Sequence, residues 1–358
     1  MSAAILLRLP SCYPKGLRFQ SYPAMMFCIN HESQVVFVAR IIVSFGVPSD
    51  GFRALYDEGH IIHIPPAGAR FSREEMLSLL PDADAVLACT AFPREMVEAG
   101  KKLKLIVCYG AGYDSIDVAA ATECGIPVFN IPDTVTAATA ELAIAHMMSM
   151  ARRIRELDGL VRTMAPNELF VMGRRMGTRL EGATLGIVGM GRIGGKVADF
   201  GRVMGMRILY TARTPKPERN ALGDEHVDLE TLMKESDFIS LHCPHTPETH
   251  GMISREMIGL MKPTAFLVNT ARGPVLDEEA LIDALREKKI AGAALDVYIG
   301  EPNVNPAFFE LDNVQLTPHS GSNTLATRNQ MAEAASHRIL EVLAGRIPEN
   351  LLNPEALR

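Results

Sequence analysis

The chain has 358 residues, of which 47% are hydrophobic and 22% charged, values typical of a globular protein that buries large cores in two domains. Its net charge of −6 argues against a binder of nucleic acid or anionic membrane. The six scattered cysteines lack metal-binding spacing, which predicts reduced thiols and no metal site in a cytoplasmic protein, and no apolar run has the length of a membrane span.

Residues 1–34 lack the periodicity of helices and strands. Three basic residues and no acid precede Glu32, as in some targeting peptides. Three prolines, however, interrupt both the apolar core of a signal peptide and the amphipathic helix of a transit peptide. We therefore expect a disordered extension, or a start assigned upstream of Met25 or Met26, with a transit peptide as the alternative.

Short apolar segments alternate with helical segments from Arg40 onward. One predicted helix opens with the capping box Ser72-x-x-Glu75. The predicted strands are Arg40–Phe45, Ile61–Ile64, Ala85–Ala88, Leu103–Cys108 and Pro127–Phe129, and the predicted helices are Asp50–Glu58, Ser72–Leu80, Arg94–Ala99 and Ser115–Glu123. This alternation predicts a parallel, doubly wound sheet that binds ligands beyond the carboxyl ends of its strands.

A long apolar helix, Thr136–Glu156, is predicted to leave this sheet, with Thr136 as its N-cap. The alternation then resumes, and Asp228, Ser254 and Asp277 stand where N-caps belong. The later predicted strands are Leu185–Val188, Arg207–Thr211, Phe238–Cys243, Phe266–Asn269 and Gly292–Asp296, and the helices are one ending near Met204, then Leu229–Glu235, Arg255–Met261, Glu278–Lys288 and Thr324–Leu343.

The motif Gly189-x-Gly191-x-x-Gly194 lies between a predicted strand and a predicted helix. Glycine allows the tight turn and the close approach to a pyrophosphate, whose charge then lies against the helix N-terminus. Glycine triplets also occur in ordinary turns, but here the preceding strand, the helix and a second strand follow in the expected order. The sequence therefore predicts a dinucleotide site at these glycines and at Arg192 and Ile193.

We predict an α/β protein with two doubly wound parallel-sheet domains. Residues 134–320 would form a Rossmann domain that binds NAD(P). Residues 35–133 together with 321–358, which include the last helix, would form a flavodoxin-like substrate domain.

Three residues after the glycine motif have the chemistry to reduce a 2-oxo acid. The reaction needs a cation for the carboxylate, a proton donor for the carbonyl oxygen and a partner that keeps the donor charged. Arg272, His319 and Glu301 supply these groups near the ends of predicted strands. The alternative is that they are surface charges and a structural loop histidine.

From about residue 40 to 352 the chain resembles the D-isomer-specific 2-hydroxyacid dehydrogenase family. In that family the residues that match Arg272, Glu301 and His319 are catalytic. The resemblance is carried, in matching order and spacing, by the glycine motif and by the blocks Gly110–Asp117, Leu241–Thr249, Asn269–Pro274, Asp296–Pro302 and Thr317–Ser322.

The resemblance implies a mechanism in which Arg272 holds the carboxylate and carbonyl oxygen of the substrate. The backbone N–H groups of Ala111 and Gly112 would bind the carboxylate from the other domain. His319 would donate a proton as hydride reaches C2, and Glu301 would keep its imidazolium available near neutral pH. The family's formate dehydrogenases have glutamine in place of Glu301, which argues against that activity.

The turn after the second strand of the nucleotide unit indicates the cofactor. Segment Tyr210–Lys216 contains no acid, and Ala212 stands where the NAD-using members carry aspartate. Arg213, Thr214 and Lys216 could hold a 2′-phosphate, as in the family's NADP-dependent glyoxylate/hydroxypyruvate reductases, although a solvated turn and use of NAD remain alternatives. The resemblance adds further cofactor contacts at Cys243, Pro244, Thr249, Thr270, Ala271, Asp296, His319 and Ser322.

Other activities and the assembly also follow from the resemblance. An NAD-dependent phosphoglycerate or D-lactate dehydrogenase is the alternative enzyme, but Ala88–Cys89 has no basic neighbour for a substrate phosphate. A dinucleotide-sensing scaffold is the alternative class, since some relatives are transcriptional corepressors. The segments Thr136–Met150 and Ala151–Arg179 match the family's dimer interface, which predicts a homodimer with C2 symmetry that binds no nucleic acid or membrane.

Overall fold

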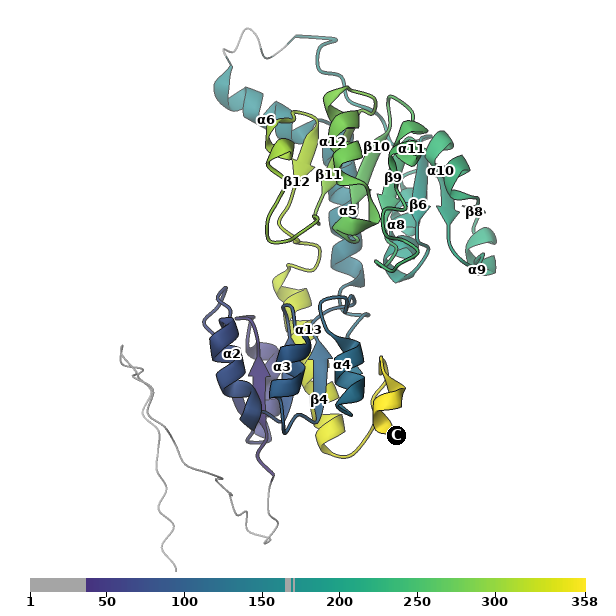
Figure 1. Cartoon of the computed structure of the whole chain (residues 1–358). Coiled ribbons are helices and arrows are strands. Elements are labelled where there is room, and N and C mark those ends of the chain that lie inside the picture. Colours follow the sequence, from purple (N-terminus) through teal and green to yellow (C-terminus); the bar gives the residue numbers. More distant parts are fainter. Residues whose placement is uncertain (1–36, 165–168, 170) are drawn as a thin grey trace, which may run out of the picture. The chain divides into compact units, whose positions relative to one another are not determined.

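The structure, a computed structural model, describes residues 37–164, 169 and 171–358, so the expected N-terminal extension lies outside it. The first of its sheets, whose strand β4 is labelled in Figure 1, is five-stranded and parallel, with strand order β2-β1-β3-β4-β5. This order is that of a flavodoxin-like, doubly wound sheet. The elements are β1 Arg40–Val43, β2 Ile61–His63, β3 Ala85–Ala88, β4 Leu105–Cys108, β5 Val128–Phe129, α1 Arg53–Asp57, α2 Arg73–Leu79, α3 Arg94–Ala99, α4 Val118–Glu123 and α13 Leu325–Leu343.

Alternating side chains of the first sheet enter two hydrophobic cores. On one face, Ile41 and Val43 of β1 pack in a cluster with Met331 and Ile339 of α13. On the other face, Ile42 belongs to the cluster formed with α2, α3 and α4. Because both faces are covered, the strands are apolar throughout, as buried parallel strands are. The last helix of the chain therefore completes the core of the first sheet.

The second sheet is seven-stranded and parallel, with strand order β12-β11-β10-β9-β6-β7-β8. The order reverses at β6, which is the switch point where this kind of sheet binds ligands. The strands are β6 Thr184–Val188, β7 Arg207–Thr211, β8 Glu225–His226, β9 Phe238–Leu241, β10 Phe266–Asn269, β11 Gly292–Leu295 and β12 Val314–Leu316. The helices are α5 Thr136–Ala151, α6 Ile154–Thr163, α8 Arg192–Val203, α9 Pro217–Asn220, α10 Leu229–Glu235, α11 Arg255–Gly259 and α12 Glu278–Arg286.

Helices also cover both faces of the second sheet. Phe238 and Phe266 stack with ring centroids 5.4 Å apart on the face shared with α5 and α8. Ile239 and Leu267, the next residues along the same strands, pack with α10, α11 and α12. With both faces covered, the carboxyl edge of the sheet remains for a ligand.

The structure corrects the long helix predicted at Thr136–Glu156. Helix α5 ends at Ala151, and α6 begins only at Ile154, because Arg153 has φ 53°, a left-handed conformation that no α-helix contains. Val135, rather than Thr136, is the N-cap of α5. The predicted N-caps Asp228, Ser254 and Asp277 do accept backbone N–H groups at the starts of α10, α11 and α12.

Smaller differences concern short elements. The helix predicted from Ser115 begins at Val118, because the Asp117 side chain caps the N–H of Ala120. Elements α9, β8 and β12 were not predicted, since each has five residues or fewer and no clear periodicity. Among the described helices, none combines the length and apolarity needed to cross a membrane.

Candidate active site

The glycine loop after β6 passes close to the end of β9. Gly189 has φ +99°, and a Cβ there would lie 2.7 Å from the backbone nitrogen of Cys243. A Cβ at Gly194 would lie 2.1 Å from the Gly189 carbonyl oxygen, so helix and strand pack without room for a side chain. A Cβ at Gly191 would meet nothing within 4 Å. The middle glycine therefore faces open space, as a loop that cradles a ligand does.

Helix α8 presents free donors beside this space. Its N-cap Gly191 has no side-chain cap. The backbone N–H groups of Arg192, Ile193 and Gly194 donate no hydrogen bond within the described part of the chain. Unpaired N–H groups and the positive end of the helix dipole attract an anion. This stretch therefore fits the pyrophosphate of a dinucleotide.

The Arg192 side chain is engaged outside the loop. Its Nε lies 2.6 Å from Oδ1 of Asp133, in the segment that precedes α5. Both side chains are more than half exposed. The pair joins the glycine loop to the start of α5, a link with no local signal in the sequence.

The turn after β7 separates the three residues predicted to bind a 2′-phosphate. Lys216 lines a groove of about 700 Å³ together with Gly191 and Arg192. Its backbone N–H donates to Tyr210 Oη at 2.8 Å. Arg213 and Thr214 are exposed. The structure thus brings Lys216 beside the glycine loop and leaves the other two at the surface.

One carboxylate outside this turn lies within electrostatic reach of Arg213. A hydrogen bond with Thr246, and more weakly the charge of Arg213, lowers the pKa of Glu248. Glu248 belongs to the loop after β9, outside the segment Tyr210–Lys216. The lack of acids in segment Tyr210–Lys216 therefore does not exclude a carboxylate that acts on Arg213 from another loop.

The residues after β9 and β10 that are predicted to contact the cofactor lie at the carboxyl edge of the second sheet, as the glycine loop does. Cys243 is buried, and the carbonyl oxygen of Pro244 accepts a 2.7 Å hydrogen bond from Thr249 Oγ1. The backbone N–H of Ala271 donates to Asn269 Oδ1 at 3.0 Å. Thr270 Oγ1 is buried without a partner among the described residues. Such an orphaned hydroxyl is available to a ligand.

The loop after β4 leaves two backbone donors free. The Ala111 carbonyl accepts from Asn130 Nδ2 at 2.8 Å, and the Gly112 carbonyl accepts from Cys108 Sγ at 3.0 Å. The N–H groups of Ala111 and Gly112 have no acceptor in the ranges that the structure describes. With the carbonyl groups fixed, the loop presents its N–H groups to an anion.

Arg272 comes directly against this loop. Its Nε lies 3.0 Å from Oδ1 of Asp114, and its Nη1 donates to the Ala271 carbonyl at 2.7 Å. A Cβ at Gly112 would lie 1.5 Å from Arg272 Nη2, so a larger residue there would displace the guanidinium. The guanidinium is therefore held on two sides, and its third nitrogen faces Gly112. Sequence reasoning missed Asp114, although it lies in the block Gly110–Asp117.

Glu301 and His319 form a direct pair. His319 Nδ1 lies 2.7 Å from Glu301 Oε2, and Glu301 Oε1 accepts the Tyr298 N–H at 2.9 Å. Burial by itself would raise the pKa of Glu301, but the hydrogen bond and charge of His319, with smaller contributions from Tyr298 and Arg272, lower it. Glu301 is therefore a carboxylate at neutral pH. His319 Nε2 has no partner among the described residues, and the His319 side chain is half exposed.

Asp296 organises the loop that carries His319. Its carboxylate accepts hydrogen bonds from Thr317 Oγ1 and from the N–H groups of Ser320 and Gly321. Its carbonyl accepts the His319 N–H at 2.8 Å. His319 has φ 52°, which costs an L-residue about 1–2 kcal/mol, so these bonds hold a disfavoured conformation. The predicted contact Ser322 follows this loop and is partly buried.

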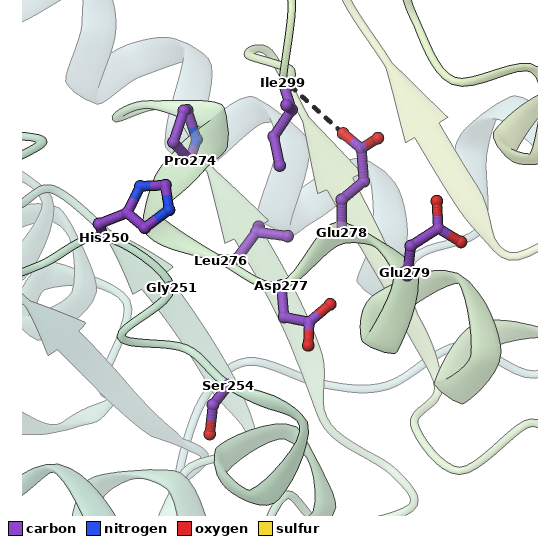
Figure 2. Close-up of a pocket in the computed structure, with 9 residues that line it drawn as sticks. All are labelled: His250, Gly251, Ser254, Pro274, Leu276, Asp277, Glu278, Glu279 and Ile299. Carbon is purple, nitrogen blue, oxygen red and sulfur yellow. Dashed lines mark hydrogen bonds between the residues drawn. The ribbon is translucent and has the colours of Figure 1, made fainter.

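A hollow of about 470 Å³ lies beside Ile299, on the segment that leads to Glu301 (Figure 2). None of the residues predicted to bind substrate or cofactor lines this hollow. Glu278 at the start of α12 accepts the Ile299 N–H at 3.3 Å, the dashed line in Figure 2. The acidic start of α12 therefore helps to fix the segment that carries Glu301. The lining residues are His250, Gly251, Ser254, Pro274, Leu276, Asp277, Glu278, Glu279 and Ile299.

Two arrangements thus share one edge of the second sheet. A glycine turn leads into a helix with free N–H groups, which is how this fold binds a dinucleotide phosphate. Arg272, Glu301 and His319 follow the neighbouring strands β10, β11 and β12. The fold and the site define a nicotinamide-dinucleotide-dependent oxidoreductase.

Comparisons with known proteins give the family. Residues 144–321 match the family model described as D-isomer specific 2-hydroxyacid dehydrogenase, NAD binding domain. The chain is 46% identical over 297 residues to a glyoxylate reductase of Thermococcus litoralis, covering 82% of this chain and 88% of that protein. The chain belongs to the D-isomer specific 2-hydroxyacid dehydrogenase family.

Solved structures agree with this family. The TT0316 protein from Thermus thermophilus superposes with a TM-score of 0.81 at 39% identity, covering 87% of this chain and 99% of that one. A glyoxylate reductase from Paecilomyes thermophila gives a TM-score of 0.77 at 31% identity, with 89% and 99% covered. The fold predicted from the sequence is thus confirmed.

Proposed function

We propose that this protein reduces a small 2-oxo acid of the glyoxylate or hydroxypyruvate type to the D-2-hydroxy acid, with NADPH as the preferred reductant. The observation that carries the proposal is the 2.7 Å contact between His319 Nδ1 and Glu301 Oε2. It pairs a proton donor with a carboxylate at the edge where the dinucleotide fold binds ligands. The glyoxylate reductases among the relatives support the same reaction.

Residues 134–320 would bind the dinucleotide, and residues 35–133 with 321–358 would bind the substrate. The free N–H groups of Arg192, Ile193 and Gly194 would hold the pyrophosphate. When bound, the reduced nicotinamide supplies the hydride. The remaining contacts would come from the loops at the same edge, namely Gly189, Gly191, Cys243, Pro244, Thr249, Thr270, Ala271, Asp296, His319 and Ser322.

The substrate carboxylate would lie between the loop after β4 of the first sheet and the loop after β10 of the second sheet. The N–H groups of Ala111 and Gly112 would donate to it from one side, and Arg272 would donate from the other. A guanidinium also reaches the adjacent carbonyl oxygen, so the 2-oxo acid would be fixed at both functional groups.

His319 would then supply the proton. Glu301 accepts a hydrogen bond from the Nδ1–H group of His319 and so stabilises the imidazolium. The Nε2 proton is then available to the substrate's carbonyl oxygen. The hydride forms a C–H bond at C2 while the carbonyl oxygen gains this proton. The carbonyl group thus becomes an uncharged hydroxyl group. Because His319 is half exposed, it can be reprotonated from solvent.

The coenzyme preference would come from the turn after β7. Arg213, Thr214 and Lys216 would contact the 2′-phosphate of NADP, and Ala212 leaves no acid to hold the ribose hydroxyl of NAD. The position of Lys216 beside the glycine loop supports this assignment. Glu248 would weaken the preference, since its charge opposes a phosphate near Arg213.

The protein would be a cytoplasmic homodimer with C2 symmetry. None of the residues of α6 is buried. Its apolar side chains Ile154, Leu157 and Val161 are spaced along one side of the helix and are exposed by 54%, 36% and 67%. A second copy would cover them, and a monomer mass by light scattering at micromolar concentration would contradict the proposal.

A steady-state panel tests the reaction. Glyoxylate, hydroxypyruvate, pyruvate and a phosphorylated 2-oxo acid would each be assayed with NADPH and with NADH. The proposal expects the highest kcat/KM for one of the first two with NADPH, and His319→Gln as the inactive control. A higher kcat/KM for pyruvate or for the phosphorylated acid would replace the proposed substrate.

A further inference from the structure

The loop of His319 is connected to a chain of buried and partly buried polar side chains that includes residues of α5 and β12. Thr317 Oγ1 lies 2.5 Å from Asp296 Oδ1. The Nε2 atom of His146, on α5, lies 3.0 Å from the same hydroxyl oxygen. His146 Nδ1 lies 2.9 Å from Gln315 Nε2, and Ser149 Oγ donates to Gln315 Oε1 at 2.6 Å. The chain thus extends from α5 to the carboxylate that holds the His319 loop.

The direction of these hydrogen bonds follows from their ends. Asp296 is an acceptor, because both of its carboxylate oxygens take backbone N–H groups. Thr317 must then donate to Asp296 and accept from His146 Nε2. At the other end, Ser149 donates to the amide oxygen of Gln315, so the amide nitrogen donates to His146 Nδ1. Every proton in the chain points toward Asp296.

This arrangement requires a neutral His146 with its proton on Nε2. The side chain is fully buried, and burial lowers the pKa of His146, although the charge of Asp296 opposes that effect. Helix α5 also contacts the loop directly, since a Cβ at Gly321 would lie 3.2 Å from Thr139 Cγ2. The loop therefore rests on α5 through packing and through hydrogen bonds.

We propose that His146 and Thr317 are positioning residues for the proton donor. They direct a hydroxyl proton at Asp296, which keeps its carboxylate aligned across the N–H groups of Ser320 and Gly321. That alignment holds His319 in its left-handed conformation, with Nδ1 on Glu301. The inference deepens the proposed function and rests on it, because it assumes that His319 moves the proton.

Thr317→Val and Thr317→Ser form a matched pair. Valine has the shape of threonine without the hydroxyl, and serine keeps the hydroxyl. Losing a hydrogen bond to a buried carboxylate is expected to lower kcat for glyoxylate by about tenfold or more in Thr317→Val. Thr317→Ser should recover most of kcat. The Kd for NADPH should change far less than kcat in either variant, because the glycine loop is untouched, and this separates loss of positioning from loss of the coenzyme site.

A second pair of variants changes the hydrogen-bond chain at His146 on α5, in case Thr317→Val does not fold. His146→Leu removes the donor to Thr317, whereas His146→Gln keeps an N–H group near the position of Nε2. His146→Leu should lower kcat in the same direction, and His146→Gln less. In the wild type, the ¹⁵N shifts of His146 should report the neutral Nε2–H form; an Nδ1–H or charged ring would overturn the proposal.

Hydrogen exchange makes the test independent of activity. Amides in a peptide spanning 317–324 should exchange faster in Thr317→Val than in Thr317→Ser, while a peptide from β9 should be unchanged. If wild-type protein reduces no 2-oxo acid, the proposed function fails, yet this comparison still decides whether the chain holds the loop. Equal exchange in the two variants, or an unchanged kcat in Thr317→Val, would overturn the positioning role.

Discussion

Two parts of the same sheet edge differ in how their side chains are held. After β10, β11 and β12, the side chains of Arg272, Glu301 and His319 each have a hydrogen-bond partner. After β7, Arg213 and Thr214 are exposed, and no hydrogen bond of either side chain is found among the described residues. The groups proposed for the chemistry are thus preorganised, whereas those proposed for coenzyme choice gain their partners only when a ligand binds.

The largest effect is expected from breaking the ordered part. Replacing the imidazole by an amide in His319→Gln removes the proton donor, so kcat should fall by roughly 10²–10⁴-fold. The Kd for NADPH, measured by fluorescence titration, should change far less than kcat, because His319 is one of many proposed contacts and the glycine loop is untouched. A variant with wild-type kcat would mean that His319 does not move the proton.

A smaller effect is expected at the exposed part. A guanidinium bonded to a phosphate is a charge-assisted contact worth about 1.5–3 kcal/mol, or about tenfold or more in binding. Arg213→Ala should therefore raise KM for NADPH about tenfold and leave KM for NADH nearly unchanged. Arg53→Ala, a surface arginine on α1, serves as the control. Equal losses with both coenzymes would remove Arg213 from the specificity role.

Asp114 tests whether preorganisation matters for substrate binding. Its carboxylate holds Arg272 Nε, and both side chains are partly exposed, so screening reduces the strength of the pair. Asp114→Ala should raise KM for glyoxylate by roughly fivefold with a smaller change in kcat. Asp114→Asn keeps an acceptor oxygen and should lie between wild type and alanine. A lower KM in Asp114→Ala would show instead that Asp114 competes with the substrate carboxylate.

The stability of the sheet edge should also depend on a neutral imidazole at His242, directly after β9. Burial lowers the pKa of His242 from 6.5 to about 3. Between these two pKa values the unfolded chain binds a proton that the folded protein does not. The free energy of unfolding should therefore decrease as the pH is lowered, by up to about 1.4 kcal/mol per pH unit. Urea unfolding between pH 7 and 4.5 should show a shallower decline for His242→Gln, and parallel slopes would contradict the assignment.

Much of the architecture could be predicted because it has local signals. Buried parallel strands are continuous apolar runs, the Gly189 motif has a fixed spacing, and N-caps such as Asp277 stand one residue before their helices. The positions of Arg272 and Glu301 after predicted strands followed from these signals, whereas His319 was found only through the family resemblance, because β12 was not predicted. Their catalytic roles stay predictions.

The partners of these residues could not be predicted. Asp114 and Arg272 are 158 residues apart in the chain, and His146 and Thr317 are 171 apart. Nothing local marks such pairs, since they depend on how the sheets and α5 pack. The break at Arg153 is similar, because a single left-handed residue leaves the apolar pattern of the helix unchanged.

The return of α13 to the first sheet has a consequence for synthesis on the ribosome. Met331, Ala335 and Ile339 belong to the same core as Ile41 and Val43, so strands made first remain without one wall of their core until the last helix emerges. The second sheet, from β6 to β12, is translated in one continuous stretch. The nascent chain can therefore finish the nucleotide-binding sheet while the N-terminal strands still await α13 and expose their apolar faces to chaperones.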